Sequence, residues 1–118
     1  MHPKDALGRY GEQLAVQRLE QEGLRILDRN WRCPVGEIDI VARDGDCLVI
    51  CEVKTRRRLT HGSPVEAVGP RKLRRLRELA VHWLAAHRMH APTIRFDVVG
   101  IIQPREGGPI VTYLRGVD

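Results

Sequence analysis

A chain of 118 residues has the length of one ordinary domain, and we expect residues 1–118 to fold as a single unit around its own core. Hydrophobic residues make up 42% and charged residues 30%, a balance that excludes an intrinsically disordered chain. No run approaches the roughly 20 apolar residues of a membrane span, and the N-terminus lacks the apolar core of a signal peptide, so we expect a cytoplasmic protein.

The first predicted element is a helix over residues 6–22. Its apolar positions recur with helical spacing, and Gly23 follows as a residue that favours a helix end. The apolar stripe is expected to contain Leu7, Tyr10, Leu14, Ala15, Arg18 and Leu19.

Three β-type segments follow this helix. We expect strands over residues 24–31, 37–43 and 47–55, separated by short turns. Pro34 and Gly36 mark the first turn, and Asp44-Gly45-Asp46 is a strong hairpin signal for the second. The three segments therefore predict an antiparallel meander.

The second half of the chain predicts a helical crossover and two more strands. Ser63, Pro64 and Glu66 combine an N-cap, a proline at the first helical position and a capping-box acid, which indicates a short helical turn. Gly69-Pro70 interrupts it, so a longer helix is expected over residues 70–88. Its apolar face is expected to contain Leu73, Leu76, Ala80, Trp83, Leu84 and His87.

Strands over residues 94–102 and 110–114 complete the order αβββαββ. A meander is antiparallel, whereas a helical crossover joins parallel strands. The sequence therefore predicts an α/β fold in which helices flank a central mixed β-sheet.

The net charge of +5 is unevenly distributed along the chain. Between residues 54 and 77, nine basic side chains stand against a single acid, Glu66. Such a run can attract a polyanion, and it can equally be a solvated helix face. The run alone does not decide between these readings.

Two acid-bearing segments lie beside this basic run. Asp39 is expected on the second strand, while Glu52 and Lys54 end the hydrophobic third strand, two residues apart and therefore on one face. Because a hairpin joins the two strands, Asp39 and Glu52 can meet at one end of the sheet. Two carboxylates at close range repel each other unless a cation lies between them, and Mg²⁺ is typically held by one or two carboxylates, water and phosphate oxygens.

This constellation predicts hydrolysis of a phosphodiester bond. A bound Mg²⁺ would polarise the phosphate and activate a water, and Lys54 could orient that water or stabilise the charge that develops in the transition state. The backbone carbonyl of Val53 is a further candidate ligand. Taken alone, Glu-x-Lys on a strand is a common charge pattern, so the prediction depends on its combination with Asp39 and the basic run.

The segments Gly36–Val41 and Glu52–Arg56 resemble the motif of PD-(D/E)xK nucleases. More narrowly, nearly the whole chain resembles the YraN-like family of small bacterial proteins, which are similar to Holliday-junction resolvases. The matching positions outside the two segments are Gly8, Gly11, Glu12, Ala15, Asn30, Gly62, Glu66, Ala67, Val68 and Lys72.

The resemblance implies a restriction-endonuclease-like fold for one nuclease domain, with Asp39, Glu52 and Lys54 as its core catalytic group. It also implies that Glu12 points from the first helix toward the metal site, as a catalytic residue or a metal ligand. The residues alone favour another reading of Glu12, an exposed acid beside the apolar stripe that pairs with an arginine. Glu37 shares a face with Asp39 and could be a second acid of the site or an ordinary strand-edge residue.

We therefore expect a Mg²⁺-dependent endonuclease, with Mn²⁺ as an alternative metal, that cuts branched or single-stranded DNA in recombination or repair. The specification of DNA comes from the resemblance. A homodimer and a recombination or branch-migration protein are candidate partners. The expected nucleic-acid-binding residues are Arg56, Arg57, Arg58, Lys72, Arg74 and Arg75.

The rival hypothesis is a non-catalytic nucleic-acid-binding module, or a partner subunit of a recombination complex, that keeps the fold without cleavage.

Overall fold

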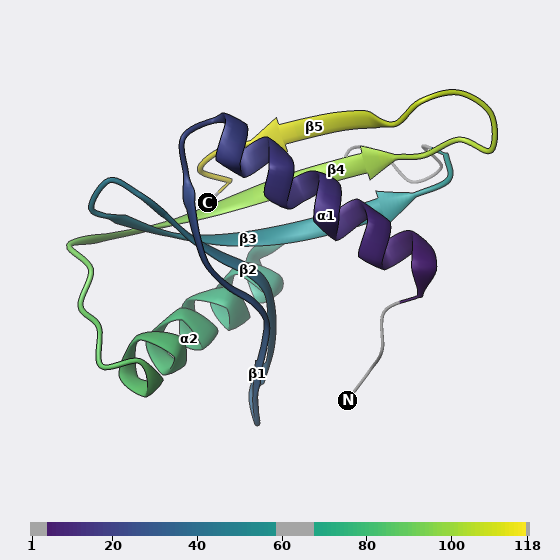
Figure 1. Cartoon of the computed structure of the whole chain (residues 1–118). Helices are drawn as coiled ribbons and strands as arrows, with labels where there is room; N and C mark the ends of the chain where they lie inside the picture. The colour runs from purple at the N-terminus through teal and green to yellow at the C-terminus, as the bar shows by residue number, and fades with distance from the viewer. Residues whose placement is uncertain (1–4, 59–67, 118) are drawn as a thin grey trace.

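The computed structural model describes residues 5–58 and 68–117, and within these ranges five strands and two helices follow the predicted order αβββαββ (Figure 1). The elements are α1 (Ala6–Gln21), β1 (Arg25–Cys33), β2 (Gly36–Asp44), β3 (Cys47–Arg56), α2 (Pro70–Ala86), β4 (Thr93–Ile102) and β5 (Ile110–Leu114). The predicted short helical turn that begins at Ser63 lies outside the described residues.

The strands form one mixed sheet, as the sequence predicts, and their order in it is β1-β2-β3-β4-β5. Three pairs, β1–β2, β2–β3 and β4–β5, are antiparallel, and β3 and β4 run parallel because α2 carries the chain back across the sheet. The central strands β3 and β4 are nearly continuous hydrophobic runs, which is typical of strands covered on both faces.

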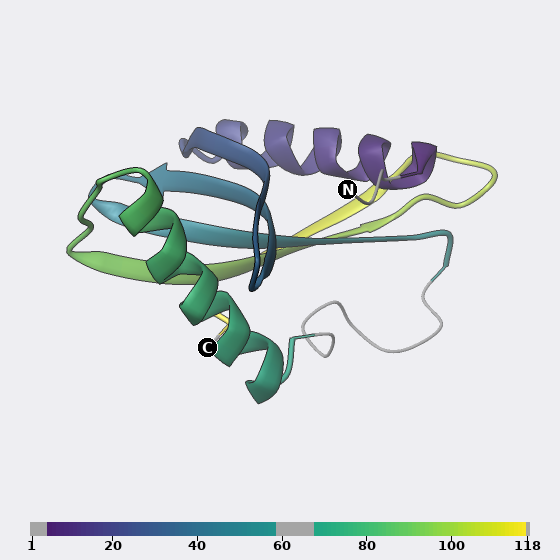
Figure 2. The ribbon, with the colours of Figure 1, turned by 90° about the horizontal axis from the view of Figure 1, so that it is seen from below.

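The helices cover opposite faces of the sheet, so the molecule has three layers (Figure 2). On the α1 side, the core contains Ala15, Val16, Leu19, Ile40, Val49, Cys51, Val99 and Ile101. On the α2 side, it contains Ile38, Val41, Ile50, Leu73, Leu76, Leu79, Trp83, Phe96 and Val98. The predicted apolar face of α2 is largely confirmed, with Leu79 as a further buried residue and with His87 exposed rather than covered.

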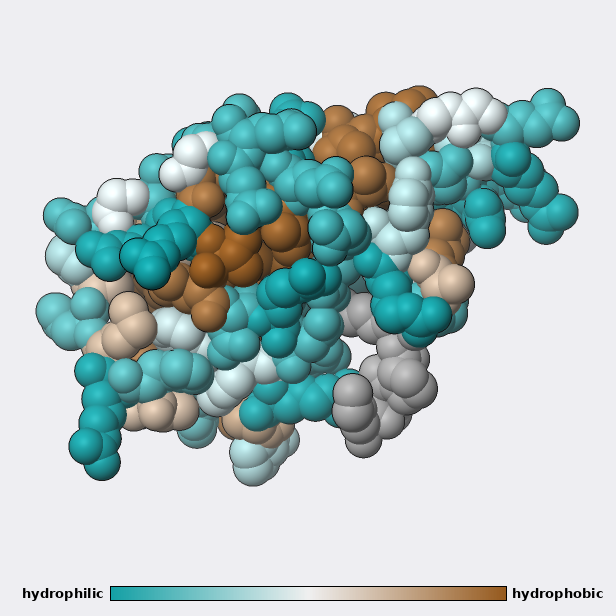
Figure 3. Space-filling model, viewed as in Figure 1, coloured by the Kyte–Doolittle hydropathy of each residue, from teal (hydrophilic) through white to brown (hydrophobic). Residues whose placement is uncertain are grey.

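The predicted apolar stripe of α1 is partly correct, because Ala15 and Leu19 are buried as expected, but the buried face is rotated toward Gly11 and Glu12. Its buried residues are Gly11, Glu12, Ala15, Val16 and Leu19, whereas Tyr10 is 40% exposed. The cause is a close approach to β3, because a Cβ atom at Gly11 would lie 1.9 Å from Thr55 Oγ1. Helix α1 therefore turns its small residues Gly11 and Ala15 toward the sheet. The molecular surface on the α1 side is largely hydrophilic, with apolar patches beside the helix (Figure 3).

Strands β1 and β2 curve away from the rest of the sheet (Figure 1), and their pairing is interrupted at Asn30 and Asp39. These residues lie opposite each other, between the pairs Arg29–Ile40 and Trp31–Ile38. Asn30 has a φ of 52°, in the left-handed region that asparagine tolerates better than most residues. Ile38 and Ile40 consequently face opposite layers, although residues two apart on a regular strand share a face.

Neither helix in the described part of the chain is long and apolar enough to cross a membrane.

Candidate active site

The candidate site lies where β2 separates from β3. Pairing between the two strands ends at Ile40–Cys51, and the bend carries the rest of β2 away. Beyond this point the Asp39 side chain takes over the role of a backbone acceptor on β2, because its Oδ2 accepts a hydrogen bond from the backbone N–H of Val53 at 2.9 Å. The bend in β2 therefore positions a carboxylate beside the end of β3, as the sequence predicts.

Glu52 is the centre of the site. Its side chain is only 8% exposed, although it carries a carboxylate at the end of a hydrophobic strand. Lys72 Nζ of α2 lies 3.2 Å from its Oε1, and Lys54 Nζ lies 3.7 Å from the same atom. Two strands and one helix thus bring an acid pair and two ammonium groups together.

Burial is the main reason why the pKa of Glu52 lies above its ordinary value of 4.5, because a charged carboxylate loses solvation there. The negative charge of Asp39 raises this pKa further, while Lys72 and Lys54 oppose the shift. Two nearby lysines therefore do not fully compensate the acid pair. A carboxylate held in this way is a candidate functional group, since structural acids normally receive enough donors to favour the charged form.

Glu12 is buried in the core rather than placed beside the apolar stripe of α1, and its side chain is 2% exposed. Its Oε1 accepts hydrogen bonds from Asn30 Nδ2 at 2.7 Å, Arg29 Nη2 at 3.1 Å and Arg29 Nε at 3.2 Å. The expectation of an exposed acid is therefore wrong, although the expected arginine partner is present. Through Asn30, Glu12 supports the bend opposite Asp39, and we interpret it as a positioning residue for that carboxylate.

The structure brings Asp39, Glu52, Lys54 and Lys72 together but does not gather three acidic ligands. Among residues 5–58 and 68–117, no group of three or more His, Cys, Asp or Glu side chains is arranged to hold a metal ion. Two carboxylates nevertheless fit Mg²⁺, which keeps several waters and uses one or two carboxylates plus substrate phosphate oxygens. The Val53 carbonyl would add an oxygen, because N–H and C=O of one strand residue point to the same edge.

The other residues predicted from the sequence fall into two groups. Arg56, Arg57, Arg58, Arg74 and Arg75 are exposed, as expected for side chains that meet a polyanion. Glu37 forms an ion pair with Arg32, whose Nη2 lies 3.3 Å from the Glu37 Oε2. We interpret Glu37 as an ordinary strand residue rather than a second acid of the site.

Sequence reasoning missed two features of the site. Lys72 was expected to contact nucleic acid from a basic helix face, yet it reaches Glu52. Its position on the helical wheel of α2 indicates only that Lys72 lies at the boundary between the apolar and the basic face. The contact with Glu52 on β3 could not be predicted from that position, because it depends on how the crossover places α2 against the sheet. The support of Asn30 by Glu12 was also missed, and a single asparagine within a strand-like segment was its only signal.

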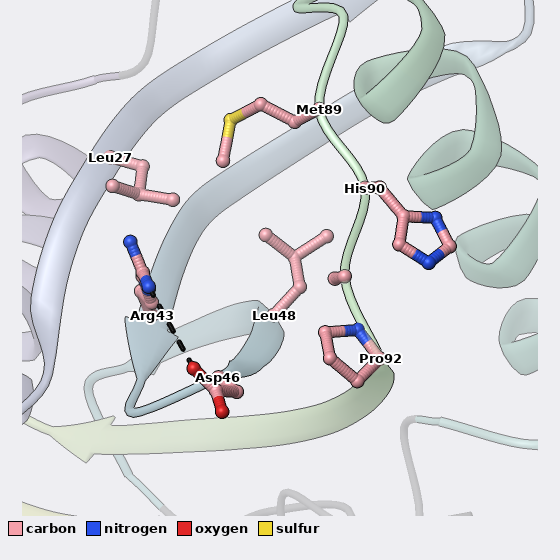
Figure 4. Close-up of a pocket in the computed structure, with 8 residues that line it drawn as sticks. Leu27, Arg43, Asp46, Leu48, Met89, His90 and Pro92 are labelled. Carbon is pink, nitrogen blue, oxygen red and sulfur yellow. Dashed lines mark ion pairs between the residues drawn. The ribbon is translucent and has the colours of Figure 1, made fainter.

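A cavity at the opposite end of the sheet provides a contrast. It has a volume of about 150 Å³ and lies between the β2–β3 hairpin and the segment after α2, where Leu27, Leu48, Met89 and Pro92 surround it (Figure 4). Its charged rim is an exposed pair, Arg43 and Asp46, whose nearest side-chain atoms are 3.9 Å apart. Among the described residues, its lining contains one acid and no lysine, whereas the candidate site combines two acids with two lysines. The cavity therefore does not offer the same chemistry.

Comparison with known proteins shows that most of the chain matches a single protein family. The model of the uncharacterised protein family UPF0102 matches residues 11–101. A UPF0102 protein of Kineococcus radiotolerans is 56% identical over 116 residues, which cover 98% of this chain and 95% of that protein. UPF0102 proteins of Beutenbergia cavernae and Streptomyces griseus are 56% and 53% identical and cover 99% and 100% of both chains, respectively.

Proposed function

The chain belongs to the uncharacterised protein family UPF0102, and we propose that it is a divalent-metal-dependent nuclease that hydrolyses phosphodiester bonds in DNA. The observation that carries this proposal is the placement of Glu52, buried beside Asp39 and flanked by Lys54 and Lys72. Burying Glu52 beside a second acid is costly for folding, and a cation that binds there during catalysis would explain why the protein keeps this arrangement.

Asp39 and Glu52 would hold Mg²⁺ or Mn²⁺, with the Val53 carbonyl as a third oxygen. When bound there, the metal would polarise the scissile phosphate and make a coordinated water more acidic. Lys54 would then contact a non-bridging phosphate oxygen and stabilise the charge that develops on it. Lys72 would share this role from α2, because its ammonium already lies 3.2 Å from the same Glu52 oxygen that Lys54 contacts.

DNA as the substrate, and a role in recombination or repair on branched or single-stranded DNA, follow from the resemblance to PD-(D/E)xK nucleases and resolvase-like proteins. The exposed arginines after β3 and along α2 support a polyanionic substrate. Their contacts with phosphates would give steep salt dependence and little sequence preference.

The test is a cleavage assay on labelled single-stranded, duplex, flap and four-way-junction DNA, and on RNA, with Mg²⁺, Mn²⁺ or EDTA. We expect cuts that require metal and that disappear in Asp39→Asn and Glu52→Gln. Glu37→Gln is the matched control, because it removes a carboxylate from the same strand without touching the acid pair. Equal cleavage by wild type and Glu52→Gln would refute the proposed site.

A second candidate is a nucleic-acid clamp that does not cut. The ion pairs of Glu52 with Lys54 and Lys72 favour it, because they partly neutralise the acid in the absence of any metal. A clamp binds DNA equally well with EDTA and leaves every substrate of the panel intact. The same assay therefore separates the two functions.

A further inference from the structure

We propose that the cavity between the start of α1 and the end of β3 binds a second phosphate of the DNA strand that is cut, the neighbour of the scissile phosphate. This inference rests on the proposed nuclease function and names the substrate feature that the site requires. It predicts that the cleaved strand continues past the start of α1.

The cavity directly adjoins the candidate active site. It has a volume of about 250 Å³ and is lined by Asp5, Leu7, Gly8, Val53, Lys54, Thr55 and Arg56. Val53 and Lys54 line this cavity and also belong to the candidate active site. The Val53 N–H donates a hydrogen bond to Asp39, and Lys54 forms an ion pair with Glu52. A phosphodiester strand that crosses the active site therefore has this cavity within reach of its next phosphate.

The strand wall of the cavity is an open edge of β3. The last β2–β3 pair is Ile40–Cys51, so residues after Cys51 have no β2 residue opposite them. The Val53 N–H points to this edge, because it donates to Asp39. Alternate residues of a strand direct their N–H groups to the same edge, which places the Thr55 N–H on this side as well. The edge thus presents a backbone donor next to two cationic side chains.

The cations are suited to phosphate. Arg56 is held against the strand, because its Nη1 donates to the Thr55 carbonyl oxygen at 3.0 Å. Its remaining N–H groups keep the planar fork geometry that matches phosphate oxygens. Lys54 contributes a second positive charge from the active-site side.

One acid opposes this charge. Asp5 lines the cavity, and its Oδ1 accepts a hydrogen bond from the Gly8 N–H at 2.7 Å as the N-cap of α1. A negative charge beside a phosphate weakens binding, so substitutions at Asp5 and Arg56 should have opposite effects. This opposition makes the proposal testable in two directions.

The first test measures binding of a short single-stranded oligonucleotide in EDTA, so that no cleavage occurs. Each phosphate in turn is replaced by a neutral methylphosphonate, and Kd is measured for wild type, Arg56→Met and Arg57→Met. We expect a methylphosphonate at one position to weaken wild-type binding about tenfold. The same replacement should leave the Kd of Arg56→Met almost unchanged, because this variant already lacks the charged hydrogen bond from Arg56 to that phosphate. Arg57→Met is the matched control, since it removes the same charge one residue from the cavity. We expect it to weaken binding overall, because Arg57 is itself a predicted nucleic-acid-binding residue, but to keep the tenfold penalty at that one neutral position.

The second test uses Asp5→Ser, which retains an N-cap side chain while it removes the negative charge. We expect it to bind the unmodified oligonucleotide about two- to threefold more tightly, and to lose this gain when the same phosphate is neutral. Glu20→Gln is the control on the same helix, because Glu20 is exposed and lies far along α1 from the cavity.

Identical methylphosphonate profiles for wild type and Arg56→Met would overturn the proposal, and so would a gain in Asp5→Ser that persists at every neutral position. Both readouts are binding constants and do not depend on cleavage. Failure of the nuclease proposal would appear separately, as intact DNA with Mg²⁺ and no difference between wild type and Glu52→Gln.

Discussion

Two buried carboxylates in this sheet, Asp97 on β4 and Glu52 on β3, differ in how the protein surrounds them. Asp97 Oδ1 accepts hydrogen bonds from Arg95 Nε at 2.9 Å and the Gly116 N–H at 3.0 Å. Its Oδ2 accepts from Arg95 Nη2 at 3.0 Å and Tyr113 Oη at 2.5 Å. Among residues 5–58 and 68–117, the groups paired with Glu52 are two ammonium groups, which lie 3.2 and 3.7 Å from its Oε1, and a second acid lies beside it.

We interpret this difference as that between a structural acid, Asp97, and the acid that we propose to be functional, Glu52. Arg95 also bonds Asp44 Oδ2 at 2.9 Å, so the Asp97 cluster ties β4, β5 and the β2–β3 hairpin together. Burial, and then the hydrogen bond to Asp97, raise the pKa of Tyr113, which keeps its hydroxyl a donor. At Glu52 the surroundings instead raise the pKa of the acid itself. A buried acid that its neighbours leave under-compensated marks the site where an external cation fits.

The largest expected effect comes from Glu52→Gln. If this acid is functional, the substitution lowers the rate of metal-dependent DNA cleavage by about a thousandfold. The free energy of unfolding should stay unchanged or rise, because the variant removes a buried charge that repels Asp39. Single-turnover cleavage and urea denaturation measure the two quantities, and a large loss of stability without loss of cleavage would reverse the assignment.

Asp97→Asn should give the opposite pattern. Loss of the charge leaves Arg95 without its bidentate partner, and we expect the free energy of unfolding to fall by about 3 kcal/mol. Cleavage per folded molecule should be retained, as measured after correction for the folded fraction. Tyr113→Phe is a milder form of the same test, with an expected loss of about 1.5 kcal/mol, because it removes one hydrogen bond to a charged group.

Gly11→Ala should act on the packing between α1 and the end of β3. The added Cβ would meet Thr55 Oγ1 at 1.9 Å and Thr55 Cβ at 2.8 Å, so α1 must shift away from β3. We expect a loss of about 2 kcal/mol in the free energy of unfolding, measured by urea denaturation. Thr55→Gly in the same chain should restore most of this loss. If Gly11→Ala alone is as stable as wild type, the close approach is absent.

The smallest effect is the pH dependence of stability that Glu52 adds. The pKa of Glu52 is 4.5 in the unfolded chain and higher in the folded chain. In the pH window between the unfolded and the folded pKa, the folded chain therefore binds more protons than the unfolded chain. Stability relative to Glu52→Gln should therefore fall as pH rises through this window. Urea denaturation of both proteins from pH 4 upward measures the difference, and a difference that grows with pH would contradict the shift.

Much of the fold could be predicted from the sequence, because local signals and sheet topology agree. The hairpin at Asp44–Asp46, the helix that starts at Pro70 and the strand at Ile110–Leu114 all occur where periodicity and turn chemistry indicate them. The meeting of Asp39 with the end of β3 was also predictable, since a hairpin joins their strands.

The remaining features depend on contacts between distant segments. The buried face of α1 is set by the fit of Gly11 against Thr55, and a helical wheel that ranks residues by hydrophobicity gives glycine no weight. Glu12 is buried because Arg29 and Asn30 of β1 bind its carboxylate, and neither partner is close in sequence. The contact of Lys72 with Glu52 likewise requires the crossover that places α2 under the sheet.

Calorimetric titration of Mn²⁺ into wild type, Glu52→Gln and Tyr113→Phe tests the contrast between the two acids most directly. The titration is performed above the raised pKa of Glu52, where its carboxylate is ionised. We predict Mn²⁺ binding to wild type and to Tyr113→Phe, and its loss in Glu52→Gln, although that variant remains folded. Equal Mn²⁺ binding by wild type and Glu52→Gln, or no binding by folded wild type, would contradict the assignment of Glu52 as the functional acid.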